Sequence, residues 1–144
     1  MTQLRLVLAS DGSPGALAAA RWIRDHCAHE SVVYVVTVAE GVVEVDAPTF
    51  SALPEYAESM DNAAESRARQ AIAATARVLD GFPVHPTILN GSGVGDTLLR
   101  FLETVPADAL VVGRRGSSWV RQMTMGSVSQ FLAQRSPVPL WIIP

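Results

Sequence analysis

Apolar residues occur along this chain of 144 residues in five short runs, which longer stretches of mixed character separate. The runs cover residues 4–9, 32–38, 84–89, 109–112 and 138–143 and are rich in valine, isoleucine and leucine. Because their apolar residues follow one another without alternating with polar ones, we interpret the runs as strands buried on both faces. Such strands are typical of a parallel sheet with helices on both sides.

Helical periodicity appears in the stretches between these runs. Ser13-Pro14 predicts a helix start, with serine as the N-cap and proline in the first turn. The second helix is predicted over residues 55–79, and its mostly small apolar stripe predicts close packing on the sheet. The stripes of the four predicted helices are, in chain order, Ala16, Ala20, Ile23 and Cys27; Met60, Ala64, Ala68, Ala71, Ile72 and Leu79; Leu98, Leu99, Leu102 and Val105; and Val128, Phe131 and Leu132.

Five strands alternating with four helices predict an α/β fold in which right-handed crossovers join parallel strands. A chain of this length predicts a single domain over residues 1–144. The periodicity does not determine the order of the strands in the sheet. Residues 40–54 show neither period and contain Gly41, Pro48 and Pro54. Long aperiodic segments in compact domains are often functional, so we predict a mobile lid there.

Composition excludes several classes of function. The formal net charge of −3 argues against a nucleic-acid-binding face, which needs clustered positive charge. No apolar run approaches the roughly 18 residues of a membrane span, and no signal-peptide pattern is visible. Cys27 is the one cysteine and the histidines are scattered, so we predict no disulfide and no metal site. We therefore expect a cytoplasmic protein.

The stretch GRRGSSWVRQMTMGS, from Gly113 to Ser127, carries the most specific chemistry in the chain. It contains the spacing Gly-x2-Gly-x9-Gly-Ser, formed by Gly113, Gly116, Gly126 and Ser127, directly after a predicted strand. Glycines allow φ > 0 and let backbone N–H groups approach an anion, while a helix start adds unpaired N–H groups. The pattern therefore favours phosphate binding. The alternative is that these glycines only shape turns and that Ser127 caps a helix together with Gln130.

With this motif the chain resembles the ATP-binding members of the universal stress protein family. The likeness covers nearly the whole chain, including LRLVLASDGS, VVYVVTV, GSGVGDTLL, DALVVGRRG and SPVPLWII. One departure is the turn before the third helix, which reads Gly91-Ser92-Gly93 where the family often has Gly-x-Pro. The resemblance implies a doubly wound five-stranded parallel sheet in the order 3-2-1-4-5, similar to adenine nucleotide alpha hydrolases. That order places the ends of strands 1 and 4 beside the crevice where such sheets bind ligands.

The resemblance also implies which residues bind the nucleotide. Asp11 would accept a hydrogen bond from the adenine amine, and the residues lining the base would be Ala9, Val38 and Val112. The residues implied at the phosphates are Gly113, Arg115, Gly116, Gly126, Ser127 and Val128. Plainer interpretations stand beside these roles, because Asp11 could serve only backbone N–H groups in its turn and Val38 could be an ordinary core residue.

We expect an ATP-binding regulatory protein of the stress response, with a requirement for Mg²⁺ left open. No residue is identified as catalytic, since no side chain has the pattern of a base beside bound metal. At most, slow ATP hydrolysis or autophosphorylation is expected. The apolar run at 138–143 and the resemblance predict a homodimer through the last strand. The alternatives are a dimeric interaction module of the same fold without nucleotide, or an enzyme of the alpha hydrolase superfold, which the missing catalytic motif disfavours.

Overall fold

Five parallel strands form one sheet in the order β3-β2-β1-β4-β5. The computed structural model describes residues 2–39, 54–114 and 131–144. The strands are β1 (Arg5–Ala9), β2 (Val32–Ala39), β3 (Val84–Asn90), β4 (Ala109–Gly113) and β5 (Leu140–Ile143). The α/β class, the parallel sheet and the order 3-2-1-4-5 are therefore confirmed.

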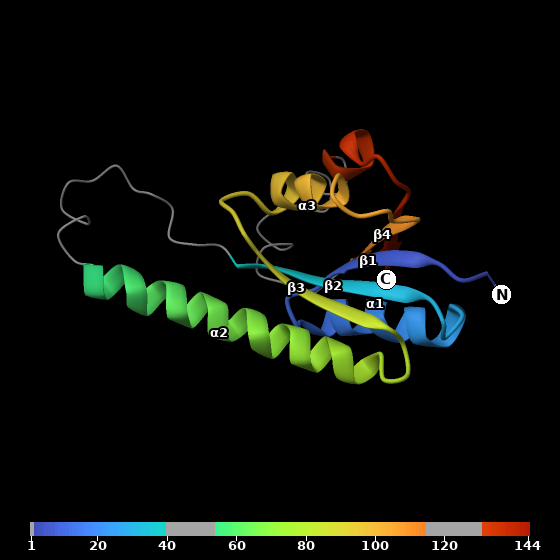
Figure 1. Cartoon of the computed structure of the whole chain (residues 1–144), viewed down its shortest axis with the longest axis horizontal. Helices are drawn as coiled ribbons and strands as arrows, with labels where there is room; N and C mark the ends of the chain where they lie inside the picture. The colour runs from blue at the N-terminus through green and yellow to red at the C-terminus, as the bar shows by residue number, and fades with distance from the viewer. Residues whose placement is uncertain (1, 40–53, 115–130) are drawn as a thin grey trace.

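Helices cover both faces of the sheet, as Figure 1 shows. Helices α1 (Pro14–His26) and α2 (Pro54–Val78) lie on one face, and α3 (Val94–Leu102) lies on the other beside a further helical segment at residues 131–135. The predicted start of that fourth helix, at Val128, lies outside the described residues. The predicted lid also lies outside them, except for Pro54, which begins α2.

Two apolar layers, one on each face, result from the alternation of side chains along the buried strands. Leu6 and Leu8 of β1 pack with α1 and α2, whereas Val7 and Ala9 pack with α3 and Leu132. This arrangement explains why the central strands are apolar at successive positions, because each face has its own helical cover. The edge strand β3 is only partly buried.

Local sequence signals set the start of α1 and the packing of α2. Ser13 has extended backbone angles and its Oγ accepts a hydrogen bond from Ala16 N at 3.3 Å, so the predicted N-cap is confirmed. Ala68 and Ala71 of α2 are buried, and so is Leu79 directly after its end, as the predicted stripe requires. No helix among the described residues is long and apolar enough to cross a membrane.

Two predicted boundaries are wrong for identifiable reasons. The last strand begins at Leu140 rather than at 138, because Ser136 Oγ donates to the Val138 carbonyl at 2.6 Å and holds a turn there. Helix α3 ends at Leu102 and does not reach Val105. There Glu103 N and Thr104 N bond to carbonyls three residues back, which tightens the last turn before Pro106.

The beginnings of β1 and β4 are joined by a pair of hydrogen bonds. Arg5 N donates to Asp108 Oδ2 at 2.8 Å, and Asp108 N donates to the Arg5 carbonyl at 2.7 Å. These partners are 103 positions apart in the sequence. The central strand of the sheet is therefore paired with a segment from the last third of the chain.

Candidate functional site

The carboxyl ends of β1 and β4 lie at one edge of the sheet, where the strand order reverses. The two strands are parallel neighbours, with Leu8 opposite Val111. The turn that contains Asp11 follows β1, and Gly113 ends β4. Open α/β sheets bind ligands in the crevice at such a switch point. The structure thus brings Asp11 and Gly113, singled out separately in the sequence, to the same edge.

Asp11 lies in a turn that its own side chain stabilises. Its Oδ1 accepts a hydrogen bond from Ser13 N at 3.0 Å, which is the backbone role considered as the plainer interpretation. Asp11 is partly exposed, and its second carboxylate oxygen has no hydrogen-bond partner within the described part of the chain. The side chain can therefore stabilise the turn and still accept a hydrogen bond from a ligand.

Gly113 is required for a close approach rather than for an unusual backbone angle. Among the described residues only Gly12 and Gly81 have positive φ. A Cβ on Gly113 would lie 2.5 Å from the carbonyl carbon of Gly15 and 3.0 Å from Ala16 N. The end of β4 therefore packs against the first turn of α1, and no larger residue fits there without moving one of them.

The predicted apolar contacts of the base differ in how much surface they offer. Ala9 and Val38 belong to the core on the α3 side, and Val38 is only 8% exposed. Val112 is partly exposed and packs against the same cluster. Any contact from Ala9 or Val38 to a base would thus use a small part of the side chain.

The remaining residues predicted at the phosphates follow β4 in the sequence. Arg114 N donates to the Ile143 carbonyl at 2.7 Å, so the segment leaves the sheet alongside the end of β5. The remaining predicted residues, Arg115, Gly116, Gly126, Ser127 and Val128, lie outside the described residues. Their roles remain predictions.

Three residues at this edge were not singled out by the sequence, namely Ser10, Thr37 and Thr75. All three are buried, and their hydroxyls bond to one another or to the backbone around Asp11. One signal could have identified Thr75, because it lies four residues after Ala71 on the buried stripe of α2. A polar residue in an apolar stripe indicates a specific hydrogen-bond partner.

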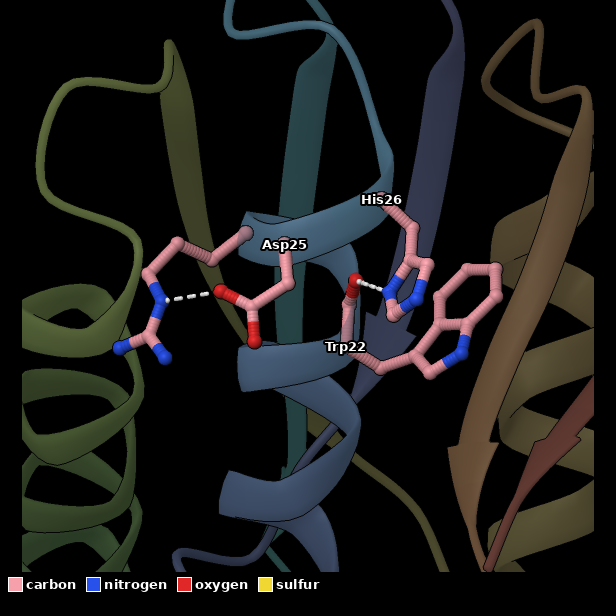
Figure 2. Close-up of polar contacts among 4 residues, drawn as sticks. Trp22, Asp25 and His26 are labelled. Carbon is pink, nitrogen blue, oxygen red and sulfur yellow. Dashed lines mark hydrogen bonds and ion pairs between the residues drawn. The ribbon is translucent and has the colours of Figure 1, made fainter.

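Two separate polar contacts lie near the end of α1, as Figure 2 shows. Arg24 Nε and Asp25 Oδ1 form an exposed ion pair at 2.9 Å, and this hydrogen bond lowers the pKa of Asp25. His26 Nδ1 donates to the Trp22 carbonyl at 2.9 Å, and its ring stacks on the Trp22 indole. These contacts satisfy the groups locally and show no ligand site.

Outside the switch point, three further features were considered as sites: metal-ligand groups, the Cys27 thiol and a surface hollow. Within the described ranges no three His, Cys, Asp or Glu residues are grouped as a metal site would need. Burial raises the pKa of the Cys27 thiol, which disfavours the nucleophilic thiolate. A shallow hollow of about 350 Å³ lies between edge strand β3 and α3, and it contains none of the predicted site residues. Its lining is Leu89, Asn90, Thr97, Arg100, Phe101 and Thr104.

The order of the sheet and the position of the Asp11 turn define a doubly wound α/β protein whose candidate ligand site is at the topological switch point. The model of the universal stress protein family matches residues 4–144. The chain belongs to the universal stress protein family. No curated protein matches this sequence significantly.

Solved structures with the same fold include three from this family. A universal stress protein, UspA, from Lactobacillus plantarum has a TM-score of 0.70 and 18% identity, with 100% of both chains covered. A family member from Arabidopsis thaliana with AMP bound has a TM-score of 0.69 and 17% identity, covering 97% of this chain and 90% of that one. A universal stress protein in complex with cAMP has a TM-score of 0.64 and 23% identity, covering 100% of this chain and 99% of that one. Likeness at this identity establishes the fold.

Proposed function

We propose that this protein is a nucleotide-binding regulatory protein of the stress response that binds ATP at the carboxyl ends of β1 and β4. The observation that carries the proposal is the placement of the Asp11 turn and Gly113 at the one edge where the strand order reverses. Two structures of the same fold, with AMP and with cAMP, support an adenine nucleotide as the ligand class.

The two ends of ATP would meet different chemistry. At the β1 end, Asp11 would accept a hydrogen bond from the adenine amine with the carboxylate oxygen that Ser13 leaves free. Ala9, Val38 and Val112 would contact the base. At the β4 end, the segment from Gly113 to Val128 would supply backbone N–H groups, the Ser127 hydroxyl and Arg115 to the phosphates.

The residues at this edge support binding rather than fast catalysis. Phosphoryl transfer needs a positioned base or a water-orienting group beside bound metal. Asp11, the acidic residue of the β1 turn, already bonds to the backbone and would face the adenine rather than the phosphates. ATP would therefore act as a bound signal, with at most slow hydrolysis or autophosphorylation, and any Mg²⁺ would arrive on its phosphates.

Titration calorimetry with ATP tests the proposal. The wild-type protein should bind ATP, and the double variant Gly116→Leu with Gly126→Leu should lose at least about tenfold in affinity, because bulky side chains keep backbone N–H groups away from the phosphates. Thermal unfolding of both proteins checks that the fold survives. Equal ATP affinity in the two proteins would reject the phosphate site, and absence of ATP binding by the wild type would reject the function.

A second candidate function is a dimeric interaction module that uses the same fold without nucleotide. The observation in its favour is the edge strand β5, whose Ile142 is the exposed large hydrophobic side chain of the described residues. Mass spectrometry of gently purified protein distinguishes the two, since the first candidate predicts a co-purified adenine nucleotide and the second predicts none.

A further inference from the structure

Three buried hydroxyl groups gather around the turn that follows β1. Ser10 directly follows that strand, Thr37 belongs to β2 and Thr75 belongs to α2, with exposed fractions of 1%, 5% and 0%. Ser31, a further buried polar residue, lies at the opposite end of the sheet and accepts from Leu4 N. Burying a hydroxyl group without a hydrogen bond costs free energy of folding. Each of these buried hydroxyls is therefore expected to have a specific hydrogen-bond partner.

The direction of each hydrogen bond follows from the number of protons available. Thr75 Oγ1 donates its single proton to the Ala71 carbonyl at 2.7 Å. Ser10 Oγ must therefore be the donor in its 2.7 Å contact with Thr75 Oγ1. Ser10 Oγ in turn accepts from Gly12 N at 3.1 Å. The chain of bonds thus runs from the turn, through Ser10 and Thr75, to the backbone of α2.

The same turn also rests directly on α2. Gly12 has φ of 78°, and a Cβ there would lie 3.0 Å from Ala71 Cα and 3.2 Å from Ala71 Cβ. From the other side, Thr37 Oγ1 donates to the Ser10 carbonyl at 2.6 Å. Both neighbours of Asp11 are therefore fixed, one by two hydroxyls and the other by contact with a helix.

We propose that Thr75 is a positioning residue for the adenine end of the site, acting through Ser10 on the placement of Asp11. The inference rests on the proposed nucleotide binding and extends it to α2, which contributes no residue to the predicted contacts. Without the Thr75 hydroxyl, Ser10 Oγ loses its acceptor and turns elsewhere, and the Gly12 N–H loses an oriented partner. Asp11, which lies between them, then loses its fixed direction.

Calorimetry on Thr75→Val and Thr75→Ser tests this role. Valine keeps the shape of threonine without the hydroxyl, so ATP affinity should fall about five- to tenfold while inorganic tripolyphosphate affinity stays at the wild-type value. Serine restores the hydroxyl and should restore ATP affinity. Thr104→Val is the matched control, because the exposed Thr104 hydroxyl donates to the Phe101 carbonyl of α3, away from the Asp11 turn, and its loss should leave both affinities unchanged. Unchanged ATP affinity in Thr75→Val, or an equal loss for the two ligands, would overturn the proposal.

Amide hydrogen exchange of Gly12 provides a readout that needs no ligand. Exchange at this amide should be several-fold faster in Thr75→Val than in the wild type and should return to the wild-type rate in Thr75→Ser. Equal exchange in all three proteins would overturn the positioning role even if ATP binds. A wild type that binds no ATP would instead reject the proposed function. If Thr75→Val does not fold, Ser10→Ala breaks the same chain of bonds and replaces it in both measurements.

Discussion

At the scale of single residues, Asp11 has the turn-stabilising role that the sequence offered as the plainer interpretation, and its geometry is compatible with the proposed adenine role. One carboxylate oxygen stabilises the turn through Ser13 N, and the side chain remains partly exposed. The sequence identified Asp11 because an acid directly after a buried strand is visible as a pattern. Ser10 and Thr37 were missed because a hydroxyl side chain carries no sign of its partner until the fold brings elements together. Thr75 was missed although its place in the apolar stripe of α2 was a usable signal.

Replacing Asp11 should separate adenine recognition from phosphate recognition. Asp11→Ala removes both carboxylate oxygens, whereas Asp11→Asn keeps an acceptor for Ser13 N and presents an N–H₂ group to the adenine amine. Both variants should bind ATP about tenfold or more weakly, with tripolyphosphate affinity unchanged, as titration calorimetry can measure. If the Asp11→Asn variant binds ATP with the affinity of the wild type, the carboxylate of Asp11 acts only in the turn.

At the scale of secondary-structure elements, the strands and helices followed their periodicity closely, and the deviations occurred where short-range hydrogen bonds intervened. β5 begins two residues late because of the Ser136 turn, and α3 ends early before Pro106. Periodicity cannot reveal where a turn hydrogen bond replaces a strand or helix hydrogen bond, since the apolar pattern continues through both places. Pro86 within β3 did indicate the position of its strand in the sheet. Proline inside a strand is typical of edge strands, and β3 is an edge strand.

The junction of β4 with α1 should make Gly113 important for stability independently of any ligand. In Gly113→Ser the added Cβ would clash with the backbone of Gly15 and Ala16, so we expect a loss of about 1–3 kcal/mol in the free energy of unfolding. Gly93→Ser is the matched control, because its Cβ would meet nothing closer than 3.6 Å and serine is a good N-cap for α3. Urea unfolding measures both. Equal stability of Gly113→Ser and the wild type would contradict the packing argument.

At the scale of the whole molecule, the fold was predictable because every level of the sequence agreed on alternating strands and helices. The order of the strands came from the family resemblance, since periodicity within each element says nothing about its neighbours. The candidate site was predictable in outline, because the ends of β1 and β4 carry Asp11 and Gly113. The contact of α2 with the Asp11 turn was not predictable from the sequence, because it depends on how closely Ala71 approaches Gly12 in the folded protein.

The position of β5 at the end of the strand order predicts association of two copies through this strand. Ile142 is 37% exposed, whereas Leu140 and Trp141 are partly buried against the core, so Ile142→Lys changes the edge without disturbing the core. Light scattering at micromolar concentration should give twice 15.4 kDa for the wild type and 15.4 kDa for this variant. Ile142→Val is the control and should remain dimeric. A wild type of 15.4 kDa would reject the dimer, and a dimeric Ile142→Lys would place the interface elsewhere.

The pairing of Arg5 with Asp108 has a consequence for how the chain folds during synthesis. β1 emerges from the ribosome first, but its neighbour β4 follows after a separation of 103 residues. At about 5–20 residues per second, the β4 side of β1 stays open for several seconds while β2 and β3 are already available for pairing. An intermediate that contains only β1 to β3 would expose the apolar side chains that β4 later covers, so nascent chains stalled before residue 109 should depend most on chaperones.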